Sequence, residues 1–562
     1  MTLSEVEWVK APEHVEGLSN GPPHRSGLRR RQHTAFQILT APALSSPHVC
    51  HHPFGCGINC AKNMRADFRE NQPLSSPSGF SETVPLPLHP LEQVLLAVVT
   101  AHLIFLPWAL GTMHVWSQAV SCGLSVLSLG LALSIRRYSG KYVSGPSFRL
   151  RLLPKLLYFP IFWIGLMFLL YILIQALNPA WRYTETDRGW WLQGVSHIAW
   201  LPTGIRTPFE QFGPWRSLMI YSSAWMSACA IWTGFTRRKS LRILLVLLVI
   251  NAFLLALFGL AERALHADRI FWSWIPPADY FVSSFIYRNH AGAYFNLALA
   301  ICCALGFWYY RRQVRRQEPS SPAVILGFFA AVIAAIVLYS YSRGATLLMI
   351  GFLATVVGMI AGTAFSSAES NRSLFTIVFA GMVFVAIVGL SLFSLKTDQL
   401  TERMRTLSQE VDVRSDQFRL AVDQATWEMA QDHLAMGWGA GSYSYCFPGY
   451  QARHPEIRFA RDRHKRLLFE HAHDDYLELL AECGCVGCAL LMAGILFYLS
   501  RLVRLRVWRN PLVSVLFLGC LVTMVHATFD FPFFNPAILI TWCCLWPVML
   551  RWLEIENQRG PA

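Results

Sequence analysis

The stretch FEHAHDDYLELLAECG (residues 469–484) places two histidines and two aspartates at the start of an apolar run that continues to residue 500. Polar groups at the mouth of a lipid-buried helix cost free energy, so each of them needs a partner or a chemical use. Residues 476–500 are long enough to span a hydrocarbon core of about 30 Å. The stretch therefore predicts a membrane protein with polar chemistry at one membrane surface.

Similar apolar runs recur along the chain. Of its 562 residues, 54% are hydrophobic and only 15% are charged, which excludes an ordinary soluble multidomain protein. We predict an all-α polytopic membrane protein with about twelve transmembrane helices and a large periplasmic loop that contains further helices. The predicted spans are residues 91–111, 117–135, 156–177, 217–235, 242–261, 290–310, 322–340, 345–363, 374–395, 476–500, 511–529 and 534–551.

The formal net charge of +14 is carried largely by short connectors between the spans. Basic residues cluster in the connectors 136–155, 236–242, 311–316 and 500–509. If the spans alternate in direction, these connectors share one side, which the positive-inside rule makes cytoplasmic. Both termini are then cytoplasmic. No coherent basic domain is left for a nucleic acid.

The domain organisation follows from these spans. Residues 1–85 are polar and rich in proline and serine, which predicts a disordered cytoplasmic segment, with Met64 as an alternative start. Residues 86–395 hold the first nine spans, 396–475 form the periplasmic loop, and 476–562 hold the last three spans and the cytoplasmic C-terminus. The cysteines and histidines near residues 48–60 match no regular zinc spacing, so no metal site is predicted.

Arginines begin two of the predicted spans at the outer face. Arg288, Asn289 and His290 stand at the N-terminus of the sixth span, where unpaired N–H groups and a guanidinium favour an anion. A simple helix cap with an arginine reaching the interface fits equally. Arg343 stands at a corner that Gly344 would allow to be tight, and its planar fork suits phosphate oxygens. Anchoring at the interface is the alternative there.

The two histidines of the opening stretch stand two residues apart on an incipient helix, which argues against a zinc pair. Asp474 or Asp475 suits the N-cap of the following helix. Asp474, Glu478 and Glu482 follow one another at helical spacing and form an acidic row. We expect the arginines of the same face to be the cationic partners of this row.

Two further segments of the outer face carry polar or helical patterns. His526 and Asp530 end the eleventh span before a proline-rich turn, and a packing role is favoured there over direct chemistry. In the long loop, apolar residues recur at helical spacing before a glycine-rich turn at residues 437–441. The apolar positions are Phe418, Val422, Ala425 and Met429.

Four segments resemble, in order, motifs of the O-antigen ligase and polymerase superfamily of bacterial inner-membrane glycosyltransferases. They are YSRGA (341–345), FRLAVDQATWEMAQDHLAMGWGAGSY (418–443), HDDYLELLAECGCVG (473–487) and HATFDF (526–531). The resemblance covers roughly residues 280–540. It departs at Asp474, because the family usually has asparagine after its key histidine.

The resemblance implies transfer of a glycan from an undecaprenyl-diphosphate carrier to a hydroxyl of lipid A-core, a glycan chain or a protein. The reaction would occur at the periplasmic face of the inner membrane, in lipopolysaccharide or other envelope polysaccharide synthesis, without a cofactor or metal. It makes His473 the candidate base or acceptor-orienting residue, with Arg343 and Arg288 on the diphosphate. The candidate substrate-binding residues are Asn289, His290, Arg419, Asp474, Glu478, Glu482, His526 and Asp530.

Two other classes of function compete with this one. A transporter or a flippase for lipid-linked glycans would place charges at the membrane midplane and show an internal repeat. A non-catalytic scaffold would not depend on the outer-face histidine and arginines. The sequence does not separate lipid, glycan and protein acceptors.

Overall fold

The computed structural model describes residues 88–138, 148–187, 189–275, 281–317, 320–365, 412–458 and 468–558. The predicted N-terminal segment, the predicted span 374–395 and residues 396–411 of the predicted loop lie outside the described residues. The chain divides into two compact units, one of which holds residues 88–136 and 151–562. Of the other unit the structure describes residues 137–138 and 148–150, which belong to β1 (Arg136–Tyr138) and β2 (Phe148–Leu150).

Every predicted span within the described residues is a helix. The helices are α2 (Pro90–Trp108), α3 (Val115–Leu133), α5 (Pro160–Leu177), α6 (Pro214–Gly234), α7 (Arg238–Ala264), α8 (Arg288–Arg316), α9 (Ala323–Tyr339), α10 (Arg343–Phe365), α16 (Asp475–Arg504), α17 (Pro511–His526) and α18 (Pro536–Asn557).

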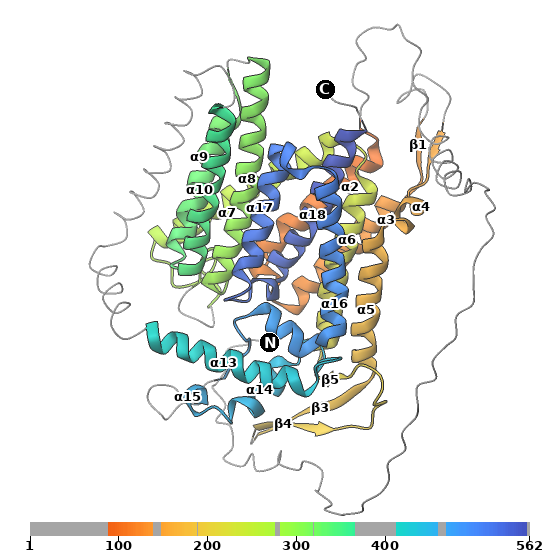
Figure 1. The fold of residues 1–562 in the computed structure, drawn as a ribbon, viewed down its shortest axis with the longest axis vertical. Coiled ribbons are helices and arrows are strands. Elements are labelled where there is room, and N and C mark those ends of the chain that lie inside the picture. The colour runs from red at the N-terminus through yellow and green to blue at the C-terminus, as the bar shows by residue number, and fades with distance from the viewer. Residues whose placement is uncertain are drawn as a thin grey trace, which may run out of the picture. The chain divides into compact units, whose positions relative to one another are not determined.

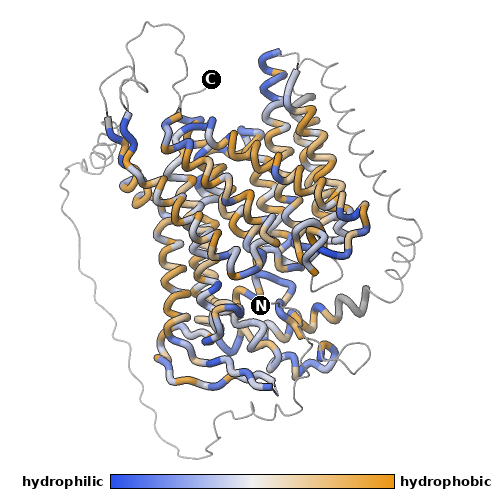
Figure 2. Tube along the Cα trace, turned by 180° about the vertical axis from the view of Figure 1, so that it is seen from behind, coloured by the Kyte–Doolittle hydropathy of each residue, from blue (hydrophilic) through white to orange (hydrophobic). Residues whose placement is uncertain are grey.

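The hydropathy of these helices identifies a membrane protein. Within the described residues, 8 helices are long and apolar enough to cross a membrane, while α9 and α17 are apolar but shorter. Figure 2 shows the apolar helices in orange and polar connections in blue. The predicted polytopic helical class is therefore confirmed, whereas the number of about twelve spans stays a prediction.

The bundle is built around α8 and α18, whose most apolar windows are 83% and 89% buried. Small residues let neighbouring helices come close to α8: Gly292 faces Ala345 of α10, and Gly519 of α17 faces Ala300. Helices in lipid pack through such close contacts between small residues. Burying apolar side chains between the helices contributes little free energy there, because the lipid is itself apolar. The contact between Gly292 and Ala345 brings the starts of α8 and α10 together.

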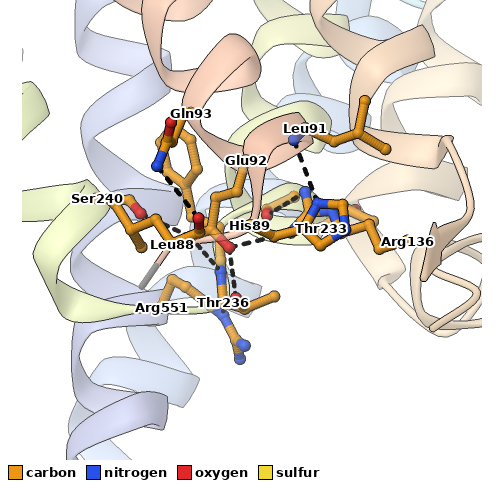
Figure 3. A network of polar contacts seen from close by, with 12 residues as sticks. Leu88, His89, Leu91, Glu92, Gln93, Arg136, Thr233, Thr236, Ser240 and Arg551 are labelled. Atoms are coloured by element: carbon orange, nitrogen blue, oxygen red, sulfur yellow. Dashed lines mark hydrogen bonds and ion pairs between the residues drawn. The ribbon is translucent and has the colours of Figure 1, made fainter. Parts of the chain in front are cut away.

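Buried charges close one end of the bundle (Figure 3). The carboxylate of Glu92 lies 3.0 Å from Arg136 and accepts a hydrogen bond from Ser240. Arg136, Lys155 of the short helix α4 (Leu153–Leu157) and Arg551 each donate to carbonyls at the C-terminal end of α6. These carbonyls have no partner inside the helix and carry its negative dipole end, so the cations cap it.

The loop that follows α5 departs from the all-α expectation. It contains β3 (Pro179–Thr186), β4 (Gly189–Gly194) and β5 (Gly204–Arg206) in the order β4-β3-β5. The pair β3–β4 is antiparallel, and β3–β5 is parallel. The strands are rich in tryptophan, threonine and tyrosine, which suit a half-buried sheet.

The long-loop helix predicted from residues 418–429 is α13 (Asp412–Asp432). It is followed by α14 (Tyr443–Gln451) and α15 (Pro455–Arg458). Val422, Ala425 and Met429 are buried in a small core of their own. Figure 1 shows α13 crossing near the start of α16, with the sheet close by.

Candidate active site

The connection from α17 to α18 joins the starts of three helices. His290 of α8 donates from Nε2 to the carbonyl of Phe531 at 3.1 Å. Asp475 at the start of α16 accepts from the Phe533 N–H at 2.9 Å. At the start of α10, a Cβ added to Gly344 would collide with the Phe529 ring. Residues 527–535, called here the 527–535 loop, therefore bring together segments that are far apart in the sequence.

A carboxylate of this loop lies between two histidines. Oδ1 of Asp530 is 3.5 Å from Nδ1 of His473, and Oδ2 is 3.6 Å from Nε2 of His526. The side chains of Asp530 and His526 are only 4% and 2% exposed, whereas that of His473 is 39% exposed. Burial favours a higher pKa for Asp530, but the two histidines outweigh it and hold the pKa of this carboxyl well below its usual range. His473 thus has a buried anion on one side and an accessible face on the other.

The ring of Phe531 lies at the centre of this cluster. It stacks on Tyr287 and His471, and it meets His290 and His473 edge to face. These contacts fix the orientation of three imidazoles from two different elements. The sequence of this loop is rich in aromatic residues, which indicates that its side chains pack together. The sequence does not indicate which ring lies at the centre.

Asp474 is the N-cap of α16, as its place before the apolar run suggested. Its Oδ1 accepts from the N–H groups of Tyr476 and Leu477, at 2.9 and 3.0 Å. The preceding His473 has φ of 58°, in the left-handed region that few residues with a side chain adopt. The backbone thus turns sharply at His473, one residue before the N-cap of α16. Such strain is concentrated at functional sites.

The expected pairing of the acidic row with arginines is wrong. Glu478 accepts from Nδ1 of His471 and from the N–H of Ala472, both at 2.8 Å. Glu482 accepts from the N–H groups of Gly441 and Tyr443. Backbone N–H groups and a neighbouring histidine are therefore the partners of these two carboxylates. Burial favours a lower pKa for His471, but Glu478 outweighs it and raises that pKa above its ordinary value.

The tenth predicted span is not one continuous helix. Gly484 breaks α16 with φ of 61° and ψ of −175°. The glycine turn of residues 433–442 fits into this break, where the N–H groups of Trp438 and Gly439 donate to the carbonyls of Ala481 and Glu482. The acids of the row therefore precede the break and lie against protein backbone. That position explains why they are tolerated next to a lipid-spanning segment.

The candidate arginines stand at the starts of neighbouring helices. Arg288 and Arg343 are the first residues of α8 and α10, and Arg343 is exposed. The tight corner before α10 is formed by Tyr341, with φ of 53°, and not by Gly344 as expected. Gly344 instead permits the close approach of Phe529.

The helix α13 adds charges at this place. Arg419 is exposed, and its charge is near enough to Tyr287 to lower the pKa of that phenol, although burial raises it overall. Burial raises the pKa of Asp423, which Arg419 and His473 lower. Asn289 donates to the Tyr287 hydroxyl at 2.8 Å. Sequence reasoning found Arg419 but missed Asp423, which follows it by one helical turn.

The arrangement offers an accessible imidazole, a buried carboxylate 3.5 Å from it, and two helix N-termini for an anionic group. Within the described ranges, no group of three or more His, Cys, Asp or Glu residues is placed to hold a metal ion. Arginines at helix starts are suited to phosphate oxygens, whereas His473 is suited to proton transfer.

Comparison with known proteins shows a family to which part of the chain is similar. Residues 328–492 match the family model described as O-antigen ligase. The match contains Arg343, Arg419 and His473, while Arg288 and the 527–535 loop lie outside it and join it through the contacts above. No curated protein matches the chain.

Proposed function

We propose, from the match of residues 328–492 to the O-antigen ligase family, that this protein transfers a glycan from an undecaprenyl-diphosphate carrier to an acceptor hydroxyl. The acceptor is lipid A-core, a growing glycan or a protein. The reaction takes place at the periplasmic face of the bacterial inner membrane, with both termini of the chain in the cytoplasm.

One observation carries this proposal. An accessible His473 is held 3.5 Å from the buried carboxylate of Asp530, beside helices that begin with Arg288 and Arg343. A carboxylate on Nδ1 selects the tautomer in which that nitrogen carries the proton, so Nε2 is free to accept another. The same cluster therefore combines a proton acceptor with groups that attract a diphosphate.

In the proposed step, Nε2 of His473 takes the proton of the acceptor hydroxyl. The acceptor oxygen forms a bond to the anomeric carbon of the glycan, and the bond from that carbon to the diphosphate oxygen breaks. The electron pair leaves with undecaprenyl diphosphate, whose growing negative charge Arg288, Arg343 and the helix N-termini stabilise. The charge of Asp530 stabilises the imidazolium that forms.

The test is transfer by full-length protein, purified from membranes, with lipid-linked glycan and acceptor from the producing strain. We expect His473→Ala to lose roughly 10²–10⁴-fold in rate, the usual contribution of general base catalysis. His266→Ala, which changes an exposed histidine of another loop, is the matched control. In cells, a deletion strain should accumulate undecaprenyl-linked glycan that wild type, but not His473→Ala, consumes.

Replacing the arginines tests the anion site separately. Arg288→Ala and Arg343→Ala should each reduce transfer, and Arg343→Lys should restore only part of it because lysine lacks the planar fork. Full surface glycan with all three alanine variants would contradict the mechanism. Movement of lipid-linked glycan across proteoliposome membranes without any covalent product would favour a flippase instead.

A further inference from the structure

A recess of about 570 Å³ opens between the sheet and the turn that follows α13. One wall consists of the paired ends of β3 and β4 and the loop after them, and the other of residues 432–437. None of the residues assigned above to proton transfer or diphosphate binding lines it. It is therefore separate from the site around His473.

One face of the recess is aromatic. Trp181 lies opposite Gly194 in the register of β3 and β4. A Cβ added to Gly194 would stand 3.7 Å from Cζ3 of the indole, so the glycine leaves that part of the ring free of a covering side chain. Flat aromatic faces of this kind bind the C–H faces of sugar rings, because their quadrupole attracts polarised C–H groups.

The polar groups of the recess suit hydroxyls. Nδ1 of His197 is 3.0 Å from the carbonyl of Val195 and must donate to it, which leaves Nε2 as an acceptor. Burial lowers the pKa of His433, so this imidazole is neutral at neutral pH and both donates and accepts. Asp432 accepts from the Tyr450 hydroxyl at 2.5 Å, which orients its carboxylate.

The recess lacks the positive charge that an anion-binding site requires among its described lining residues. No lysine or arginine is among the described residues that line it. A phosphate or nucleotide would meet the Asp432 carboxylate without a cation to offset it. A neutral polyhydroxyl ligand meets an indole, two imidazoles and a carboxylate, which is the balance of apolar surface and few polar groups expected of a ligand site.

The turn that forms one wall is bonded on its other side to α16. The carbonyls of Leu434 and Ala435 accept from Cys485 and Val486, at 2.8 and 3.1 Å. At a rise of about 1.5 Å per residue, Glu482 beside this break is about 10 Å along the helix from Asp475. A chain of sugars that begins near His473 is therefore long enough to reach this part of the molecule.

We propose that the recess is a saccharide subsite, which binds a sugar of the substrate glycan at a distance from the bond that reacts. This inference rests on the proposed function in one respect: it takes the bound glycan to be a substrate of the protein. The bound sugar belongs either to the glycan of the donor or to that of the acceptor, and both present the same hydroxyls and C–H faces.

Direct binding tests the subsite without catalysis. The probe is the free glycan, released by mild acid from the lipid-linked glycan of the producing strain, and the protein is the full chain in detergent. We expect Trp181→Ala and His433→Ala to weaken binding of this glycan by about fivefold or more, the scale of one lost aromatic or hydrogen-bonding contact. Trp200→Ala is the matched control, because this tryptophan is 74% exposed in the same loop and does not line the recess.

The steady-state kinetics identify the source of the sugar. A raised KM for the lipid-linked donor with unchanged kcat assigns the sugar to the donor, and a raised KM for the acceptor assigns it to the acceptor. His473→Ala should bind the free glycan like wild type. If Trp181→Ala and His433→Ala both bind it like wild type with both KM values unchanged, the subsite does not exist. A wild-type protein that binds the glycan without transferring it would overturn the proposed function and support the subsite.

Discussion

Asp530 is buried between His473 and His526, and no arginine or lysine is needed to keep it ionised, because the two imidazoles lower its pKa. Its contribution to the proposed reaction is to orient His473 and to stabilise the imidazolium. We expect Asp530→Asn to reduce the rate of glycan transfer by roughly 10²–10⁴-fold, as loss of an orienting carboxylate does in other base-assisted enzymes.

The measurement is kcat with purified protein, beside thermal melting to show that the variant is folded. Asp268→Asn is the control, since that side chain is 90% exposed and lies on another loop. A kcat for Asp530→Asn within a factor of two of wild type would mean that His473 does not depend on this carboxylate.

A second prediction at this scale concerns His471 and Glu478. Because the folded pKa of His471 is raised above its ordinary value, their ion pair stabilises the protein fully below pH ~6.5 and loses this effect as the pH rises through the folded pKa. The melting temperature of wild type should therefore fall, relative to that of His471→Gln, as the pH rises from 6 to 9. A difference that stays constant over this range would show that His471 does not titrate there.

Single residues were predicted unevenly. His473 and the arginines could be selected from the sequence because they stand in recognisable motifs at the ends of apolar runs; their roles stay predictions. The partners of Glu478 and Glu482 were not, since backbone N–H groups leave no mark in the sequence. The contact between His473 and Asp530 depends on the 527–535 loop lying against the start of α16, which hydropathy does not encode.

Among the elements, α16 shows that hydropathy predicts the presence of a helix but not a break within it. Its apolar residues predict a helix from about residue 476, and a helix is present. The break at Gly484 is invisible to hydropathy, because glycine is tolerated in membrane helices. The sheet after α5 was missed for a similar reason: its strands are short, and tryptophan at a membrane interface is ordinary.

The break at Gly484 gives a prediction at the scale of the element. A Cβ at this position would lie 2.5 Å from the carbonyl oxygen of Ala435, and its φ of 61° disfavours any side chain. We expect Gly484→Ala to destabilise the fold by roughly 1–3 kcal/mol and to loosen the glycine turn. Gly494→Ala, in the same helix with its nearest atoms at 3.8 Å, should leave stability almost unchanged.

Melting temperatures and limited proteolysis near residues 433–442 are the measurements. Faster cleavage there in Gly484→Ala, but not in Gly494→Ala, would show that the break holds the turn. Equal melting temperatures for both variants would mean that the turn and α16 do not depend on each other.

For the whole molecule, the cluster around His473 and the buried charges around Glu92 lie at opposite ends of α18. This helix begins at Pro536 directly after the 527–535 loop and carries Arg551 near its other end. Two of the cations at the C-terminal end of α6, Arg136 and Lys155, belong to the connector 136–155, which the positive-inside rule assigns to the cytoplasm. If that assignment holds, the site around His473 faces the periplasm, where an acceptor of an envelope glycan is found.

This orientation is testable with single cysteines on opposite connections. Asp187 lies after β3, and Arg509 lies in η3 (Val507–Arg509) between α16 and α17; both are exposed. In a Cys485→Ser background, a membrane-impermeant maleimide added to cells with a permeabilised outer membrane should label Asp187→Cys. It should label Arg509→Cys only after the inner membrane is opened. The reverse pattern would put the site in the cytoplasm and contradict the proposed orientation. Equal labelling of both positions in intact spheroplasts would contradict their placement on opposite sides of the membrane.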